Sequence, residues 1–261
     1  MLGVTEDFSW RNATIFAKAS FYAYNNPESF GQEFPDATFI SNKGSDCYVW
    51  KDGDNTLVVF RGTQPTQWSD IKADLKFRKV ESVNKLGFVH RGFHDALDVI
   101  WPQLTEAIRN KSESPNTKSN KLWFAGHSLG GALATLAAGR YNNETIRLYT
   151  YGSPRVCGKK FPKGLKFNHR YRFRNNNDIV ARVPPEWLGY QHISANGGNF
   201  IYFDSRGLPH KGFSRMFMLK HWWLGLWRGF FQDKTWDSFQ DHDVSIYYRL
   251  CREKMIEDVP V

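Results

Sequence analysis

Residues 121–141 read KLWFAGHSLGGALATLAAGRY, and this stretch decides the fold. An apolar strand at 122–125 runs into a tight turn, and a helix rich in small side chains follows through Ala138. The turn has the pattern G-x-S-x-G, in which Gly126 and Gly130 leave room for neighbouring backbone where a Cβ would clash. Ser128 then lies at a strained apex above a helix N-terminus, and we predict that it is a nucleophile.

The G-x-S-x-G pattern alone is moderately specific, and its alternative interpretation is a glycine-rich turn that holds an idle serine. The flanking sequence favours a catalytic turn, because such a turn requires a strand before it and a helix after it, and both are present. Gly131, Ala132 and Ala134 also allow that helix to lie close to a sheet.

The composition is that of a globular protein, since 41% of the 261 residues are hydrophobic and 23% are charged. Aromatic residues make up 16% of the chain, which indicates apolar surface for binding as well as a core. The net charge of +9 is concentrated in residues 155–174, which contain eight Lys or Arg and no acid. That stretch is either a solvated basic face or a surface for anionic lipid headgroups. Because no nucleic-acid-binding motif accompanies it, we expect no nucleic acid partner.

The cysteines and the N-terminal residues give information about the cellular location of the protein. The three cysteines, Cys47, Cys157 and Cys251, form no C-x-x-C pattern, so we expect neither a disulfide framework nor a zinc site, although one bridge stays open. The charged residues Glu6 and Asp7 occupy the place where a signal peptide needs an apolar stretch. We therefore expect a cytoplasmic protein, or a secreted one if a leader has been removed.

The remaining periodicities predict strands that alternate with helices, and hence one α/β domain over residues 1–261 with a mostly parallel central sheet flanked by helices. The Asp-Gly turn between the first two expected strands predicts a hairpin, and the last two expected strands read as another strand pair. Helices are expected at about 8–24, 66–77 and 94–110, and further strands at 47–50, 57–60, 145–151, 171–173, 190–193 and 199–203.

A serine nucleophile needs a histidine to take its proton and an acid to orient that histidine. After a turn of this kind, the acid precedes the histidine in the chain. The acid candidates begin with Asp178, in a polar loop just past a strand. The histidine candidates are His192, His210, His221 and His242, and the residues alone leave the choice among them open.

Eight segments, taken together, resemble the class 3 lipase family, the fungal-type triacylglycerol lipases of the α/β-hydrolase fold. They follow that family's order from about residue 57 to 248, which is far more specific than one pentapeptide. The segments are VVFRGT (58–63), WSDIKADL (68–75), VHRGF (89–93), FAGHSLGGALA (124–134), TYGSPRV (150–156), NNNDIVARVPP (175–185), YQHIS (190–194) and DHDVSIY (241–247).

The resemblance implies a role for five residues. It makes Ser128 the nucleophile, Asp178 the acid and His242 the base, and it makes the backbone N–H groups of Thr63 and Leu129 the oxyanion hole. Leu129 suits that role because it begins a helix, where N–H groups are unsatisfied. We expect His192 to be a structural hydrogen-bonding residue, and we expect no metal and no organic cofactor.

Two apolar segments concern the approach of substrate. In the family, the segment after Thr63 is a short helical lid at about 64–77, and Trp68, Ile71 and Leu75 would form its apolar, substrate-binding face; the alternative is an ordinary surface helix. Residues 213–231, FSRMFMLKHWWLGLWRGFF, read as an aromatic helix that either lines an acyl pocket or dips into a lipid–water interface. Its cationic residues make a transmembrane span improbable on energetic grounds.

The sequence therefore predicts a serine-dependent carboxylic ester hydrolase acting on lipid esters, most simply a triacylglycerol lipase with an acyl-enzyme intermediate. A phospholipase A1-type activity and a short-chain or aryl esterase are the alternatives within the enzyme class. From another class, the chain could be a catalytically inactive protein that binds lipid surfaces. Peripheral contact with a lipid–water interface is expected, and the sequence does not indicate an oligomeric state.

Overall fold

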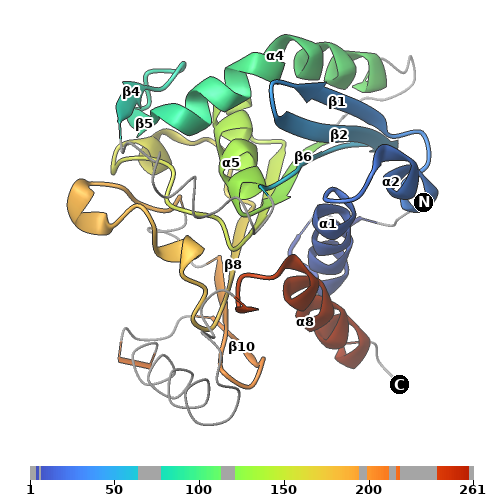
Figure 1. Ribbon diagram of the computed structural model, residues 1–261, viewed down its shortest axis with the longest axis vertical. Helices are drawn as coiled ribbons and strands as arrows, with labels where there is room; N and C mark the ends of the chain where they lie inside the picture. Colours follow the sequence, from blue (N-terminus) through green and yellow to red (C-terminus); the bar gives the residue numbers. More distant parts are fainter. Residues whose placement is uncertain are drawn as a thin grey trace.

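An eight-stranded sheet forms the centre of the molecule in a computed structural model (Figure 1). The structure describes residues 4–5, 7–63, 78–112, 121–193, 199–211, 216–217 and 240–258. The strand order across the sheet is β1-β2-β3-β6-β7-β8-β9-β10. In chain order these strands are β1 (Thr38–Asn42), β2 (Ser45–Asp52), β3 (Asn55–Phe60), β6 (Lys121–His127), β7 (Ile146–Tyr151), β8 (Arg170–Asn175), β9 (Phe200–Phe203) and β10 (Pro209–His210).

The middle of the sheet is parallel and its edges are antiparallel. Strands β3, β6, β7, β8 and β9 run in the same direction, whereas β1 and β2 at one edge and β10 at the other are antiparallel to their neighbours. In the register of β3 with β6, Phe60 lies beside Gly126. Because parallel strands end at the same edge of a sheet, the chain after Phe60 and the chain after Gly126 emerge side by side. The mostly parallel α/β sheet that the sequence predicts is confirmed.

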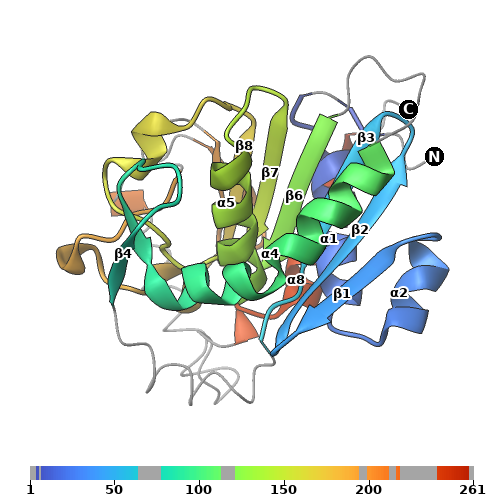
Figure 2. The ribbon, with the colours of Figure 1, turned by 90° about the horizontal axis from the view of Figure 1, so that it is seen from above.

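Helices cover both faces of the sheet (Figure 2). The helices α4 (Arg91–Ser112) and α5 (Leu129–Tyr141) pack on one face, and their core includes Leu97, Leu104 and Leu133. On the other face lie α1 (Trp10–Tyr22), α2 (Pro27–Glu33) and α8 (Val244–Glu257), whose core includes Phe16, Phe30 and Tyr247. Buried apolar side chains on both faces explain why the central strands are near-continuous hydrophobic runs.

Helix α5 is buried on almost every side, because it packs on β6 and β7 of the sheet and beside α4. Its small residues allow this close approach: a Cβ added to Gly131 would lie 2.8 Å from the Ser153 Cβ, and one added to Gly139 would lie 2.4 Å from the Phe161 ring. The helix therefore has no room to slide, and its N-terminus is held at a fixed place beside the carboxyl ends of β6 and β7.

The remaining elements are short. Strands β4 (Lys79–Glu81) and β5 (Phe88–His90) form a separate antiparallel pair. In the described part of the chain, three single-turn 3₁₀ helices connect the larger elements: η2 (Phe161–Gly164), η3 (Val180–Arg182) and η4 (Glu186–Leu188).

The predicted strand pair of residues 190–193 and 199–203 is wrong. Strand β9 does form, but it pairs in parallel with β8 and not with residues 190–193. Gln191 instead makes an isolated bridge with Cys157, and Tyr190 packs its ring against Phe88 and His90. Alternating apolar residues indicate extended backbone, but they do not identify its partner, which here is supplied by distant parts of the chain.

The basic stretch 155–174 divides into two parts with different environments. Its lysines are exposed and lie at the far end of α5 from Ser128, since Lys166 N–H and Gly164 C=O bond to the side chain of Asn142, just beyond that helix. Arg172 and Arg174 are instead buried on β8, where Arg172 lies 3.6 Å from the centre of the Phe200 ring. The predicted interpretation as a solvated basic face therefore applies to the lysines and not to Arg172 and Arg174.

The three cysteines are free and buried. Cys47 and Cys157 lie in the core on the α4–α5 face, and Cys251 lies in the core on the α1–α8 face. The single disulfide bridge that the sequence left open is therefore not formed.

Candidate active site

Ser128 occupies the turn between β6 and α5 in a strained backbone conformation, with φ of +61° and ψ of −128°. The turn is closed by backbone contacts that admit no side chain. A Cβ on Gly126 would lie 2.3 Å from the Gly130 carbonyl carbon, and a Cβ on Gly130 would lie 2.2 Å from the Phe60 carbonyl oxygen. The strand–turn–helix geometry that the sequence predicts is present.

The structure brings the three predicted side chains together from three separate elements. Ser128 lies just before α5, Asp178 lies three residues after β8, and His242 lies just before α8. The Ser128 Oγ is 2.9 Å from Nε2 of His242, and both carboxylate oxygens of Asp178 are 3.0 Å from Nδ1. All three side chains are buried.

The hydrogen-bond partners fix the tautomer of His242. A carboxylate only accepts hydrogen bonds, so Nδ1 carries a hydrogen and donates it to Asp178. Nε2 then presents a lone pair and accepts the hydroxyl hydrogen of Ser128. This is the arrangement in which a neutral imidazole can take the serine proton and a buried carboxylate can stabilise the resulting cation.

The carboxylate of Asp178 is held by three further donors. The N–H groups of Val180 and Ala181 donate to Oδ1 over 2.9 Å and 3.4 Å, and the Tyr247 hydroxyl donates to Oδ2 over 2.6 Å. Burial, with Asp178 nearby, raises the pKa of Tyr247 well above its ordinary value, so the phenol keeps its proton. Tyr247 in turn accepts the Asn175 N–H over 2.8 Å. The sequence analysis assigned no role to Tyr247, although it lies within the quoted segment DHDVSIY.

Asp241 connects the loop that carries the acid, Asp178 (the acid loop), to the loop that carries the base, His242 (the base loop). One of its carboxylate oxygens accepts the Asn175 side-chain amide over 3.1 Å, and the other accepts the Asn176 side-chain amide over 3.0 Å and the Asn177 N–H over 2.9 Å. These asparagines immediately precede Asp178, and Asp241 immediately precedes His242. The pairing therefore sets the distance between acid and base.

The residue after His242 also has a structural role. The side chain of Asp243 accepts the Ser245 N–H over 2.8 Å and caps the N-terminus of α8. In the tripeptide Asp241-His242-Asp243, the first residue joins the two loops (the Asp241 clamp), the second is the predicted base, and the third caps α8.

Gly152, just after β7, lies where the acid and the base meet. Its φ is +55°, and a Cβ there would lie 2.6 Å from Oδ2 of Asp178 and 2.9 Å from Nδ1 of His242. Only glycine leaves space for this contact at that backbone conformation. The sequence analysis missed this requirement, although Gly152 belongs to the quoted segment TYGSPRV.

The two predicted oxyanion donors lie on adjoining segments. A Cβ on Gly62 would lie 2.7 Å from the His127 carbonyl oxygen, which shows how closely the chain leading to Thr63 passes the turn. Leu129 is the first residue of α5. Among the backbone hydrogen bonds between described residues outside regular helices and strands, none has the N–H of Thr63 or Leu129 as its donor. Both remain predicted oxyanion donors.

The other histidines have different environments. His192 donates from Nε2 to the Ala181 carbonyl oxygen over 2.9 Å, as expected for a structural residue, and burial lowers its pKa well below the ordinary value. His210 bonds to the Asp204 carboxylate over 3.0 Å on β10. His221 lies outside the described residues. Among the described histidines, His242 is the one that reaches the Ser128 hydroxyl.

The predicted substrate-binding segments fall largely outside the described part of the chain. This applies to the lid at 64–77 with Trp68, Ile71 and Leu75, and to the aromatic segment 213–231 except for Met216 and Phe217. Phe217 packs its ring 4.6 Å from the ring of His210, and Met216 is 80% exposed.

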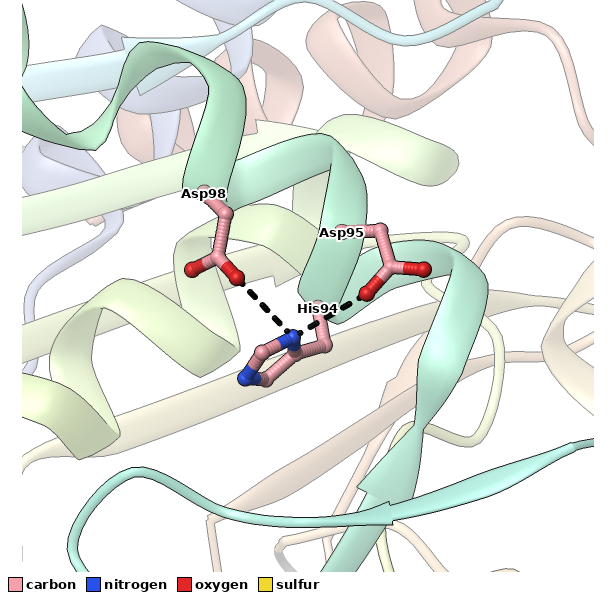
Figure 3. Close-up of side chains that lie close together, drawn as sticks. All are labelled: His94, Asp95 and Asp98. Carbon is pink, nitrogen blue, oxygen red and sulfur yellow. Dashed lines mark hydrogen bonds and ion pairs between the residues drawn. The ribbon is translucent and has the colours of Figure 1, made fainter.

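A second cluster of titratable side chains lies on α4 (Figure 3). Nδ1 of His94 is 3.3 Å from the Asp95 carboxylate and 3.2 Å from the Asp98 carboxylate. Each carboxylate also pairs with an arginine, Asp95 with Arg91 over 3.3 Å and Asp98 with Arg140. Because arginine already compensates both acids, the cluster is a surface ion-pair network and not a second centre of chemistry.

The model of the family described as lipase (class 3) matches residues 57–187, which is half of the chain. This range includes Thr63, Ser128, Leu129 and Asp178, whereas His242 lies beyond it. No helix among the described residues has both the length and the apolar character needed to cross a bilayer.

Two relatives are secreted acylglycerol lipases by name. Secreted mono- and diacylglycerol lipase 1 of Fusarium solani is 38% identical over 112 residues, which cover 41% of this chain and 32% of the relative. Secreted mono- and diacylglycerol lipase A of Penicillium cyclopium is 31% identical over 175 residues, covering 62% and 53%. The chain thus spans about a third to a half of these relatives, and their names do not support the expected cytoplasmic location.

Among solved structures, the native lipase–propeptide complex of Rhizomucor miehei superimposes with a TM-score of 0.62 at 22% identity, over 77% of this chain and 70% of that one. This likeness confirms the α/β-hydrolase fold.

Proposed function

The chain belongs to the class 3 lipase family, and on that premise we propose that it is a serine-dependent carboxylic ester hydrolase that acts on lipid esters, most directly acylglycerols. One observation carries the proposal. Ser128, His242 and Asp178 form an unbroken hydrogen-bonded chain beside two backbone N–H groups that no described residue occupies. A protein that only binds lipid surfaces has no need of such an arrangement.

In the first half of the reaction, the Ser128 Oγ attacks the ester carbonyl carbon while its proton moves to Nε2 of His242. Asp178 stabilises the imidazolium that forms. The carbonyl oxygen becomes an oxyanion, and it accepts hydrogen bonds from the N–H groups of Thr63 and Leu129. When the tetrahedral intermediate collapses, the C–O bond breaks and Nε2 returns the proton to the departing alcohol.

In the second half, a water molecule attacks the acyl-enzyme and gives its proton to Nε2 of His242. The same two N–H groups stabilise the second oxyanion. Collapse releases the fatty acid and returns the hydrogen to the Ser128 Oγ. Over one turnover, the proton that water delivers replaces the one that left with the alcohol.

Access to the nucleophile requires a change of conformation, because Ser128 is completely buried. The predicted lid at 64–77 follows Thr63 directly in the sequence, and we propose that it controls access beside the oxyanion donors. We infer that Trp68, Ile71 and Leu75 of this lid contact the acyl chain or the lipid surface. The aromatic segment 213–231 is the second candidate for acyl contact.

Hydrolysis of a series of p-nitrophenyl esters from acetyl to palmitoyl tests the proposal, with diacylglycerol, triacylglycerol and phosphatidylcholine emulsions as a second series. The variants are Ser128→Ala and the control Ser29→Ala, which changes a serine on α2. We expect the first to lose at least about 10³-fold in kcat and the control to keep wild-type rates.

The outcomes separate the alternatives. Activity that peaks at medium or long acyl chains and on acylglycerol emulsions supports a lipase. A phosphatidylcholine preference indicates a phospholipase A1-type enzyme, and activity confined to acetyl or butyryl esters indicates a short-chain esterase. If wild type and Ser128→Ala are equally inactive on every ester but both bind vesicles, the chain is a lipid-binding protein and the hydrolase proposal fails.

Location is part of the same proposal. The names of the relatives from Fusarium solani and Penicillium cyclopium describe secreted proteins, and they favour a secreted location for this chain. Fractionation of the producing cells into medium and lysate, followed by immunoblotting, distinguishes this from the cytoplasmic location expected from Glu6 and Asp7.

A further inference from the structure

Tyr24 follows α1 and lies where three segments of the active site meet. Its hydroxyl is 2.8 Å from Nδ1 of His127, the residue before the nucleophile. The same oxygen would lie only 2.0 Å from a Cβ placed on Gly62, so it rests against the backbone just before Thr63. One phenol oxygen therefore contacts both the turn that carries Ser128 and the segment that carries an oxyanion donor.

His127 extends this contact to the base. Its Nε2 lies 2.7 Å from the backbone carbonyl oxygen of His242, and the centres of the two imidazole rings are 4.5 Å apart. Because a carbonyl oxygen only accepts, Nε2 must carry a hydrogen, which leaves a lone pair on Nδ1. The Tyr24 hydroxyl must then be the donor to Nδ1. The direction of both hydrogen bonds is thus fixed by the chemistry of their partners.

His127 is suited to remain in this neutral form. Burial, with His242 nearby as a further cause, lowers the pKa of His127 well below its ordinary value. A cationic ring could not accept from Tyr24 and would repel the imidazolium that forms on His242 during turnover. The neutral ring avoids both effects.

We propose that Tyr24 and His127 are positioning residues that hold the backbone of His242 in register with Ser128 and with the Gly62–Thr63 segment. The inference rests on the proposed hydrolase activity and goes beyond it. Asp178 fixes the base through the ring nitrogen Nδ1, whereas His127 fixes it through the main chain on the opposite side. The position of Nε2 is determined when both the ring and the main chain of His242 are held, and it is not determined when only one of them is held.

The geometry supports positioning over simple space-filling. Both hydrogen bonds have donor–acceptor distances expected of strong, well-formed bonds. They join residues more than a hundred positions apart in the sequence, so no local backbone preference produces them. A displacement of a reacting group by about 1 Å can cost about 100-fold in rate, so even a small release of the His242 loop is measurable.

The test compares Tyr24→Phe, which removes one oxygen atom and keeps the ring, with the control Tyr22→Phe at the last residue of α1. The Tyr22 hydroxyl bonds to Glu33 over 2.9 Å, away from the site. On a soluble p-nitrophenyl ester, we expect Tyr24→Phe to lower kcat by about 10- to 100-fold with KM unchanged. The rate at which a fluorophosphonate labels Ser128 should fall by the same factor, and Tyr22→Phe should match wild type in both.

A second pair of variants tests His127 itself. His127→Leu removes both hydrogen bonds, whereas His127→Gln places an amide N–H near the former Nε2 and can still donate to His242. We expect Gln to recover most of the kcat that Leu loses. If His127→Leu fails to fold, Tyr24→Phe alone decides the question.

Three results decide the inference. A fall in kcat for Tyr24→Phe at unchanged KM, in protein that is fully folded at the assay temperature, supports it. Wild-type kcat and labelling in Tyr24→Phe overturn it, and so does a loss of activity that merely follows the fraction of unfolded protein. If wild-type protein neither hydrolyses any ester nor reacts with the fluorophosphonate, the proposed function fails first, which is a distinguishable outcome.

Discussion

The two sides of His242 are built by different kinds of interaction. On the nucleophile side, Ser128 is placed by backbone packed against backbone, with Gly126 and Gly130 where any Cβ would collide with main-chain atoms. On the acid side, Asp178 is placed by side-chain hydrogen bonds from Tyr247 and by the clamp that Asp241 makes. We therefore expect added atoms to disrupt the placement of the nucleophile. We expect the removal of hydrogen-bond donors or acceptors to disrupt the placement of the acid.

The largest effect is expected from adding one carbon to the nucleophile side. In Gly130→Ala the new Cβ would lie 2.2 Å from the Phe60 carbonyl oxygen, and the main chain at Phe60 is held by its pairing with Gly126 on β6. We expect a loss of about 3 kcal/mol or more of unfolding free energy, measured by urea titration.

Gly31→Ala in α2 is the matched control for this substitution, because nothing lies within 4 Å of its Cβ. We expect it to be stabilising by about 0.5–1 kcal/mol, as alanine is a better helix former than glycine. Equal stability of Gly130→Ala and wild type would show that the turn is not held by steric contact.

The next effect is catalytic and comes from the acid side. Asp178→Asn keeps the size of the side chain but presents an amide to Nδ1 of His242, which favours the wrong tautomer. We expect kcat on a soluble ester to fall by about 10³- to 10⁴-fold while the protein stays folded.

Asp204→Asn is the control for Asp178→Asn. Asp204 is also buried and also bonds to a histidine, His210, but away from the candidate site. It should keep kcat while losing stability. If both variants had the same kcat, Asp178 would not be the acid.

A smaller effect is expected where the two loops are joined. In Asp241→Asn the amide NH₂ must face either the Asn175 side-chain donor or the donors of Asn176 and Asn177, so at least one hydrogen bond is lost in a buried site. We expect a loss of about 1–3 kcal/mol in unfolding free energy. We also expect kcat to fall by about 10-fold in the fraction that remains folded, because acid and base are no longer held in register. Loss of stability alone, with unchanged kcat, would show that the clamp has no part in positioning.

The smallest effect is a change in the pH dependence of stability. Burial keeps His192 neutral in the folded protein, whereas the unfolded chain binds its proton below about pH 6.5. The unfolded state thus holds more protons in acid, and unfolding free energy should fall as pH drops below 6.5.

His192→Gln isolates this contribution. The glutamine amide can still donate to Ala181 but does not titrate. The slope of unfolding free energy against pH should therefore become shallower by at most about 1.4 kcal/mol per pH unit. Urea unfolding of both proteins between pH 4.5 and 7.5 measures it. Parallel curves would show that His192 does not contribute.

Sequence reasoning succeeded where a few neighbouring residues set the geometry. The turn around Ser128 and the helix that follows it are fully specified by residues 121–141, because glycine spacing and apolar periodicity act over one or two turns. The choice of His242 among four histidines came from resemblance, since no local feature separates it from His192 or His210.

Sequence reasoning failed where the partner of a segment lies far along the chain. Residues 190–193 have the alternation of a strand, yet the main chain at Gln191 meets Cys157 and not residues 199–203. Arg172 and Arg174 read as part of a solvated basic stretch, but β8 is an inner strand, so its side chains are buried on both faces. Charge counts along a sequence do not reveal which strand is central.

The sequence by itself determined the nucleophile turn, the α/β alternation and the family, because these depend on residue types at short, fixed spacings. Only the tertiary structure decided that Gly152 must leave room for the contact of Asp178 with His242, that Asp241 joins the acid loop to the base loop, and that Tyr24 reaches His127. Each of these contacts joins residues from distant parts of the chain. Their geometry is set by the packing of α1, α5 and α8 around the sheet, and no local pattern encodes such packing.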